Sequence, residues 1–268
     1  MKNAQTYLIP LSIIVAGALV AGGIYFGGVS PSSMTAKNNQ ASVTQGAVTQ
    51  PEIKIASITA DDHILGNPEA KIKLVEFSDT ECPYCKQFHV SLHKIIDTYG
   101  KDGTVAWVYR HFPIDQLHKN ARKEAEASEC AADQGGNDAF WKYIDEVYKR
   151  TASNDKLDPA ELPKIASSQG LDVTAFNTCL SSGKFSAKIN EQIKDANASG
   201  GNGTPYSVLI LKDKVSKEVV EFVAMANESF NAQPGQEIIL ISKDMKKVSV
   251  SGALPYDFFT DFIDLLNK

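Results

Sequence analysis

The stretch "SDTECPYCKQFHV" (residues 78–90) decides how the rest of the chain is interpreted. It holds two cysteines three residues apart, Cys82 and Cys85, with Pro83 directly after the first. An apolar stripe continues at helical spacing through Cys85, Phe88, Leu92, Ile95, Ile96 and Tyr99. Because proline favours the first position of a helix and glycine its end, we expect a helix that begins after Cys82 and ends near Gly100.

This position makes Cys82 a candidate reactive sulfur. Free backbone N–H groups and the helix dipole favour an anion at a helix amino terminus, so the pKa of a thiol there falls. The resulting thiolate is both a ready nucleophile and a good leaving group. Cys85, one turn further and facing the core, is placed to attack a mixed disulfide at Cys82, and the spacing allows the two sulfurs to bond.

Two other interpretations of the cysteine pair are weaker. A zinc site built from four cysteines usually needs two such pairs, and Cys130 and Cys179 each stand alone. A purely structural link between Cys82 and Cys85 would close a very small loop and add little stability. We therefore expect a redox-active pair, and no metal site.

The composition limits the classes of protein that fit. The chain has 268 residues, 43% hydrophobic and 22% charged, which is enough for one or two domains with a sizeable core. The formal net charge of -5 gives no reason to expect nucleic acid as a partner. Four cysteines are few for a disulfide scaffold, so the fold must depend mainly on its core.

Residues 1–29 are expected to form a membrane anchor, because the run "TYLIPLSIIVAGALVAGGIYFGG" carries no charge and about 20 apolar residues suffice to cross a bilayer. A cleaved signal peptide is the alternative. The positive charge of Lys2 favours an inside amino terminus and a catalytic domain on the extracytoplasmic side of the cell membrane. Residues 30–57 are polar and poor in large apolar side chains, which indicates a flexible linker.

The next part of the chain reads as strand, helix, strand. "KIKLVEFS" (residues 71–78) precedes the cysteine helix, and "TVAWVYRHF" (residues 104–112) is a near-continuous apolar run typical of a buried strand. Such a unit contains a parallel pair of strands.

Residues 114–198 contain five helical segments without a strand signal, and the first of them stops at Gly135-Gly136. We expect four later strands and a closing helix: "SVLILK" (207–212), "EVVEFVAMA" (218–226), "QEIILIS" (236–242), "KKVSVSGA" (246–253) and the helix 255–268. Residues 58–113 and 199–268 are therefore assigned to one α/β domain, and residues 114–198 to an all-helical insertion.

A strand ending in "EFSD", a helix opening with "ECPYC", a helical insertion and the later "GTPYSVLI" (203–210) together resemble the DsbA-like thiol–disulfide oxidoreductases of the thioredoxin superfamily. The resemblance covers roughly residues 60–211. It implies a thioredoxin fold interrupted by a helical domain, with Cys82 as the attacking sulfur and Cys85 as the resolving one. It also implies that Pro205 is a cis-proline beside them.

A cis bond at Pro205 would present the backbone of Thr204 to an extended peptide, which can pair with it as an added strand. The residues alone fit an ordinary trans proline at a strand start equally well. With Pro83 and Tyr84, Thr204 and Pro205 are the expected substrate-binding residues.

The two remaining cysteines, Cys130 and Cys179, are expected to form a structural disulfide outside the membrane. It would close a loop of about fifty residues and contribute roughly 4 kcal/mol in the chain-entropy model. Two buried free thiols are the alternative.

Three further polar side chains lie near the cysteine pair in the sequence: Glu81, His89 and His93. Glu81 would either tune the Cys82 thiolate or be a solvated loop carboxylate, and the sequence favours neither. His89 and His93 are four apart on the predicted helix, but no third metal ligand is evident nearby. We therefore expect a solvated histidine pair.

The expected function is an extracytoplasmic dithiol oxidase that introduces disulfides into unfolded exported proteins through Cys82-Pro83-Tyr84-Cys85. The redox-active disulfide would be its only cofactor. The resemblance implies reoxidation by a membrane quinone-linked partner of the DsbB or VKOR type. The alternatives are an isomerase or reductase of the same fold, or a membrane-tethered, chaperone-like peptide-binding module whose cysteines are only structural.

Overall fold

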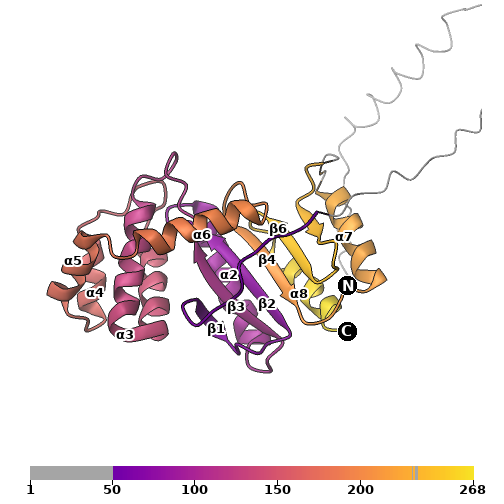
Figure 1. Ribbon diagram of the computed structural model, residues 1–268, viewed down its shortest axis with the longest axis horizontal. Coiled ribbons are helices and arrows are strands. Elements are labelled where there is room, and N and C mark those ends of the chain that lie inside the picture. Colours follow the sequence, from indigo (N-terminus) through magenta and orange to yellow (C-terminus); the bar gives the residue numbers. More distant parts are fainter. Residues whose placement is uncertain (1–50, 231, 233–234) are drawn as a thin grey trace, which may run out of the picture. The chain divides into compact units, whose positions relative to one another are not determined.

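The computed structural model describes residues 51–230, 232 and 235–268 (Figure 1). The predicted anchor, residues 1–29, and the first part of the predicted linker lie outside the described residues. Within the described part, no helix combines the length and apolar character needed to cross a bilayer. The folded part begins before residue 58, because Ile53, which we placed in the linker, is buried against the sheet.

A six-stranded sheet forms the centre of the fold, in the order β1-β3-β2-β4-β6-β5 (Figure 1). Strands β2 and β3 are parallel, as the sequence predicts, and the other neighbouring pairs are antiparallel. The strands are β1 (His63–Gly66), β2 (Ile72–Ser78), β3 (Val105–His111), β4 (Tyr206–Leu211), β5 (Ile239–Ile241) and β6 (Lys247–Ser251).

Both faces of the sheet are covered by other elements. Successive side chains of a strand point to opposite faces, so one strand contributes to two cores. Ile72 and Leu74 of β2 belong to a core shared with helices α2 (Pro83–Tyr99) and α8 (Tyr256–Leu266). Val75 and Phe77 belong to a second core. That second core is completed by Ile53 and by Ala196 of helix α6 (Ser186–Ala198).

Helix α2 follows β2 directly and returns the chain to β3, which confirms the predicted strand–helix–strand unit. It begins with Pro83 and is capped by Gly100, as expected from the sequence. Its buried side chains are Cys85, Phe88, His89, Leu92 and Ile95. Packing of this stripe on the sheet fixes the amino end of α2 just beyond the end of β2.

The helical insertion contains α3 (Ala121–Arg150), α4 (Glu161–Ser168), α5 (Val173–Ser182) and α6. The stop predicted at Gly135-Gly136 is a kink within α3, where Gly136 has φ 66 and ψ -157. Glycine adopts this non-helical backbone conformation at little cost, so the first helix ends there, as predicted, and a second helix follows beyond the kink. The insertion has its own core, yet Trp141 of α3 joins the core of the sheet and lies 4.5 Å from Trp107, measured between ring centroids.

The strand predicted at residues 218–226 is wrong: these residues form helix α7 (Lys217–Ser229). Ser216 caps the helix by accepting a hydrogen bond from the Val219 N–H. The buried side chains Val219, Val223 and Ala226 recur at helical spacing and pack against the sheet core. The β-branched residues suggested a strand, and tertiary packing overrides that weak preference. Between β4 and β6 the chain therefore forms a helix and the short edge strand β5, not a pair of strands.

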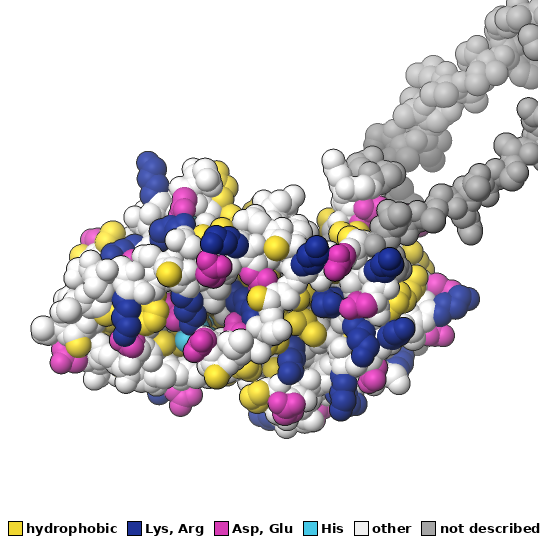
Figure 2. All heavy atoms as spheres, in the orientation of Figure 1, with side chains coloured by type: hydrophobic (Ala, Val, Ile, Leu, Met, Phe, Trp, Pro, Cys, Tyr) yellow, Lys and Arg dark blue, Asp and Glu magenta, His cyan; other side chains and the backbone are white. Residues whose placement is uncertain are grey.

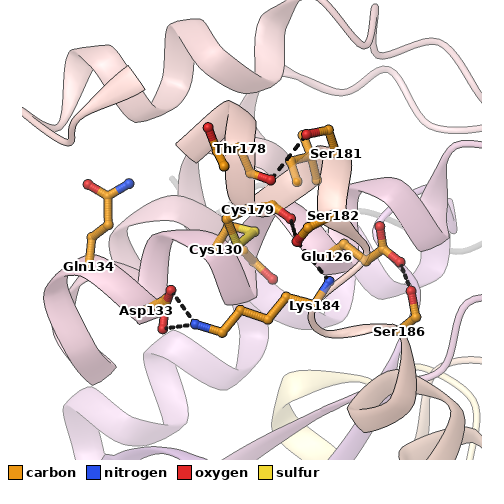
Figure 3. Close-up of a disulfide and its surroundings, with 12 residues drawn as sticks. Glu126, Cys130, Asp133, Gln134, Thr178, Cys179, Ser181, Ser182, Lys184 and Ser186 are labelled. Atoms are coloured by element: carbon orange, nitrogen blue, oxygen red, sulfur yellow. Dashed lines mark hydrogen bonds and ion pairs between the residues drawn. A yellow bond between two sulfur atoms is a disulfide. The ribbon is translucent and has the colours of Figure 1, made fainter. Parts of the chain in front are cut away.

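A disulfide joins Cys130 of α3 to Cys179 of α5, with a sequence separation of 49 (Figure 3). Beside it, Lys184 pairs with Asp133, and Ser186 donates a hydrogen bond to Glu126 (Figure 3). The chain between α5 and α6 is thus fastened to α3 by a covalent bond and by polar contacts.

Removing this disulfide with the double change Cys130→Ala and Cys179→Ala should lower the free energy of unfolding by about 4 kcal/mol, because the unfolded chain loses a closed loop. Urea unfolding followed by circular dichroism measures the difference. The control is the pair Cys82→Ala and Cys85→Ala, which leaves the structural disulfide intact. Equal stability of the two double variants would contradict the assignment.

Candidate thiol site at the amino end of helix α2

Cys82 is the residue at which α2 begins, in extended conformation, with Pro83 as the first helical residue. The turn before it is closed by a hydrogen bond from the Cys82 N–H to the Asp79 carbonyl, 3.1 Å. Cys82 is 5% exposed and Cys85 is fully buried, and both are free thiols. The sequence-predicted pair therefore lies where β2 ends and α2 begins.

The electrostatic surroundings separate the two sulfurs. A hydrogen bond from Cys85 is the largest of several contacts that lower the pKa of Cys82 to about 6, although burial opposes the charge. The backbone N–H groups of Cys85 and Tyr84 add to this effect, as expected at a helix amino terminus. Burial raises the pKa of Cys85, and the neighbouring Cys82 raises it further. Near neutral pH, Cys82 is therefore a thiolate and Cys85 a protonated thiol.

The second predicted component, Thr204 with Pro205, lies beside Cys82. The Thr204–Pro205 peptide bond is cis. The Thr204 carbonyl oxygen lies 3.4 Å from the Cys82 sulfur. Tyr84, in the first turn of α2, is 62% exposed. The Cys82 sulfur is thus contacted by Thr204, far away in the chain, and is followed directly by Pro83 and the exposed Tyr84.

Glu81 is fully buried, so the alternative that it is a solvated loop carboxylate is wrong. Its carboxylate accepts hydrogen bonds from the Thr151 hydroxyl, 2.8 Å, and the Lys156 N–H, 3.2 Å. Its carbonyl accepts a third from the Asn154 N–H, 2.8 Å. Both carboxylate oxygens thus serve to hold the loop after α3 beside the thiol site.

Glu76 of β2, which is not among the predicted site residues, is fully buried. Its carboxyl group accepts hydrogen bonds from the Ser78 hydroxyl, 2.7 Å, and from the Trp107 indole, 2.9 Å. Burial raises the pKa of Glu76 to about 7, and the charge of Cys82 contributes. A signal existed: Glu76 lies between Val75 and Phe77 in a predicted strand, and a carboxylate among apolar neighbours indicates a buried acid.

The pair Asp79 and His118 was also missed. His118 Nδ1 lies 2.9 Å from Asp79 Oδ2, and the Asp79 N–H points at the Cys85 sulfur, 3.5 Å away. Burial opposes a charge on His118, but the hydrogen bond to Asp79 and the charges of Asp79 and Cys82 raise its pKa. Next to His118, Leu117 is 69% exposed. The sequence offers no signal for this contact, because it joins two loops.

The expectation of a solvated histidine pair is wrong for His89, whose side chain is 5% exposed. Asp145 of α3 approaches both His89 and His93, so a third potential metal ligand is present. Among the described residues, the ligand atoms of these three side chains lie within 4.8 Å of one another.

Comparison with solved structures places the fold among the DsbA proteins. DsbA2 of Pseudomonas aeruginosa is similar with a TM-score of 0.57 and 23% identity, over 79% of this chain and 97% of that one. The alpha-DsbA1 of Wolbachia pipientis has a TM-score of 0.58 and 23% identity, over 78% and 92%. BdbD of Bacillus subtilis has a TM-score of 0.53 and 22% identity, over 66% and 97%.

The curated sequences that match this chain are much longer proteins, and the match covers only a part of each. The Na(+)/H(+) antiporter NhaA 3 of Salinispora tropica is 35% identical over 144 residues, which is 54% of this chain and 21% of that protein. The chain thus spans about a fifth of the length of the curated relatives it matches. The family model described as thioredoxin matches residues 59–226, more than half of the chain and the part that contains the cysteine pair and the helical insertion. By this match and by its fold, the chain belongs to the thioredoxin family.

Proposed function

We propose that the chain is a protein thiol–disulfide oxidoreductase whose reacting atoms are the sulfurs of Cys82 and Cys85. The observation that carries this proposal is the position of Cys82 at the amino end of α2, next to the buried Cys85, where its pKa is lowered to about 6. A cysteine that only stabilises the fold needs no such asymmetry. The likeness to the DsbA fold supports the same conclusion.

In the oxidising direction, a substrate thiolate attacks the Cys82 sulfur of the Cys82–Cys85 disulfide. The bond between the two sulfurs breaks, Cys85 leaves with the electron pair, and a mixed disulfide joins the substrate to Cys82. A second substrate thiolate then attacks the substrate sulfur of this mixed disulfide and expels Cys82. The substrate gains a disulfide, and its two electrons remain on the enzyme as two reduced sulfurs.

The proton balance of these steps involves Glu76. Because burial raises the pKa of Cys85, the sulfur expelled in the first step must take up a proton. Ser78 donates to Glu76 and also contacts Cys85, so it lies between the carboxyl group and the sulfur. We infer that Glu76, acting through Ser78, supplies this proton and takes it back in the reverse step. A carboxyl group with a pKa of about 7 is suited to both directions near neutral pH.

The direction we favour is oxidation. Stabilising the Cys82 thiolate stabilises the reduced form of the pair, which makes the disulfide a stronger oxidant. Isomerase and reductase activities use the same sulfurs and remain the alternatives. A module that only binds peptides is disfavoured, because the low pKa of Cys82 has no purpose in it.

The substrates we propose are unfolded exported proteins in extended conformation. Thr204 offers its backbone beside Cys82, and the exposed side chains of Tyr84 and Leu117 offer apolar contacts. Nucleic acid is not an expected partner, since acidic and basic side chains are interspersed over the face shown in Figure 2 and the net charge is -5. We further propose that residues 1–29 anchor the protein in the cell membrane, with the catalytic domain on the extracytoplasmic side. A quinone-linked partner of the DsbB or VKOR type would reoxidise it.

Reduced Cys82 should be alkylated by iodoacetamide at a rate that rises with a midpoint near pH 6, because only the thiolate reacts and its pKa is lowered. An unperturbed thiol would give a midpoint near pH 8.5. Quenched time points and peptide mass mapping separate Cys82 from Cys85, and Cys82→Ser serves as the control. A midpoint at the unperturbed value would exclude the proposed chemistry.

The direction of the reaction is tested by equilibrating the Cys82–Cys85 pair with glutathione buffers. An oxidase should show a reduction potential above about -200 mV, since the thiolate stabilises the reduced form. The fraction reduced is read by acid trapping and mass spectrometry. A reduction potential of about -270 mV would instead support a reductase.

Replacing Glu76 with Gln removes the proposed proton donor while preserving its hydrogen-bonding shape. Thiol–disulfide exchange at pH 7 should slow by on the order of 100-fold, and the step in its pH profile near pH 7 should disappear. Stopped-flow tryptophan fluorescence is a suitable measurement. The matched control is Glu81→Gln, also buried and nearer in sequence to Cys82, which should keep that step. The same profile in Glu76→Gln as in the unaltered protein would remove Glu76 from the mechanism.

A further inference from the structure

A cluster of two imidazoles and one carboxylate joins the active-site helix to the helical insertion. His89 and His93 lie one turn apart on α2, and Asp145 comes from the second half of α3. The Nε2 atoms of His89 and His93 lie 2.8 Å and 2.9 Å from the same oxygen, Asp145 Oδ1. The two Nε2 atoms are 3.2 Å apart. Three potential donor atoms from two helices therefore converge on one point.

The spacing of these atoms is close to that of a tetrahedral metal site. Zinc binds imidazole nitrogen and carboxylate oxygen at about 2.0–2.1 Å, which sets neighbouring ligand atoms roughly 3.3 Å apart. The observed separations of 2.8–3.2 Å require an adjustment of only a few tenths of an ångström. His93 and Asp145 have side chains 35% and 43% exposed, so they have room to move. The same exposure leaves a side open for a water ligand.

Of the described residues, no lysine or arginine forms an ion pair with Asp145. The charges of Asp97, one turn further along α2, and of the buried Glu76 add to the negative potential at His93. A divalent cation at this point would balance the charges of Asp145 and Asp97.

A second cluster of the same composition shows the contrast. His63 and His111 both contact Glu129, at 3.1 Å and 3.2 Å. There the ammonium group of Lys188 lies 2.7 Å from Glu129 and 3.3 Å from His63. A cation of the protein itself thus occupies the place that is open in the cluster of His89, His93 and Asp145.

We propose that His89, His93 and Asp145 bind a zinc ion, with water as the remaining ligand. Imidazole nitrogen with one carboxylate is a donor set that suits zinc. His89 Nδ1 is buried and has no hydrogen-bond partner among the described residues, so its proton stays unpaired when Nε2 binds zinc, and this cost opposes binding. The bound ion links α2, which carries Cys82 and Cys85, to α3 of the insertion.

The test uses the full chain in its oxidised form, with a purification tag that lacks histidine, so that no thiolate competes for the metal. Zinc is titrated in competition with a chromophoric chelator, and thermal unfolding is recorded with and without zinc. We expect one zinc ion per chain and a higher melting temperature in its presence. His93→Gln and Asp145→Asn, both at partly exposed positions, should each weaken binding by more than about 100-fold and abolish the thermal shift.

The matched control is His63→Gln, which alters the cluster that already holds Lys188 and should leave zinc binding unchanged. Circular dichroism verifies that each variant is folded. Absence of a stoichiometric zinc ion in the unaltered protein would overturn the proposal and leave a hydrogen-bonded packing cluster. The proposal would also be overturned if His93→Gln and Asp145→Asn bound zinc as tightly as the unaltered protein. The same holds if His63→Gln weakened zinc binding as much as they do. None of these outcomes depends on the thiol chemistry, so the two proposals fail separately.

Discussion

A negative charge on the Cys82 sulfur, held at the amino end of α2, is the interaction on which the site depends. The charge is stabilised by free N–H groups that exist only because the helix begins at this residue. The position of the helix is fixed in turn by its buried stripe against the sheet. Burial of Cys85 makes the two sulfurs different, because it keeps Cys85 protonated. The Cys85 thiol then donates a hydrogen bond to the Cys82 thiolate.

Buried carboxylates hold the surroundings of this sulfur in place. An unpaired carboxylate in a protein interior is costly, and three of the buried carboxyl groups near the sulfur are tied to particular partners. Glu76 binds the Trp107 indole of β3, and Glu81 binds the loop after α3. Asp79 accepts a hydrogen bond from the Ile114 N–H, 2.7 Å, as well as contacting His118. The same groups that shape the electrostatics of the site therefore also anchor its loops.

The helical insertion and the sheet are linked by buried ion pairs and by shared core contacts. Arg110 of β3 is buried and binds Asp62 before β1 and Asp195 of α6, at 2.8 Å and 2.5 Å. Helix α3 contributes side chains both to the core of the insertion and to the core of the sheet. The cluster of His89, His93 and Asp145 lies at this junction, one turn of α2 beyond Cys85. A cation bound there would act on the contact between the reactive helix and the insertion.

The sequence by itself determined the features that depend on neighbouring residues. Pro83 and Gly100 marked the ends of α2, apolar runs marked β2 and β3, and the spacing of Cys82 and Cys85 indicated their chemistry. Local backbone preferences and side-chain periodicity suffice for such predictions.

Tertiary structure decided what depends on residues distant in the chain. It made residues 217–229 a helix, because their contact with the sheet core outweighs a weak strand preference. It brought Asp145 to His89, and it buried Glu76 close enough to Cys82 and Cys85 for their charges to interact. These contacts arise only when the helices and the sheet pack, and no local pattern encodes which side chains then meet.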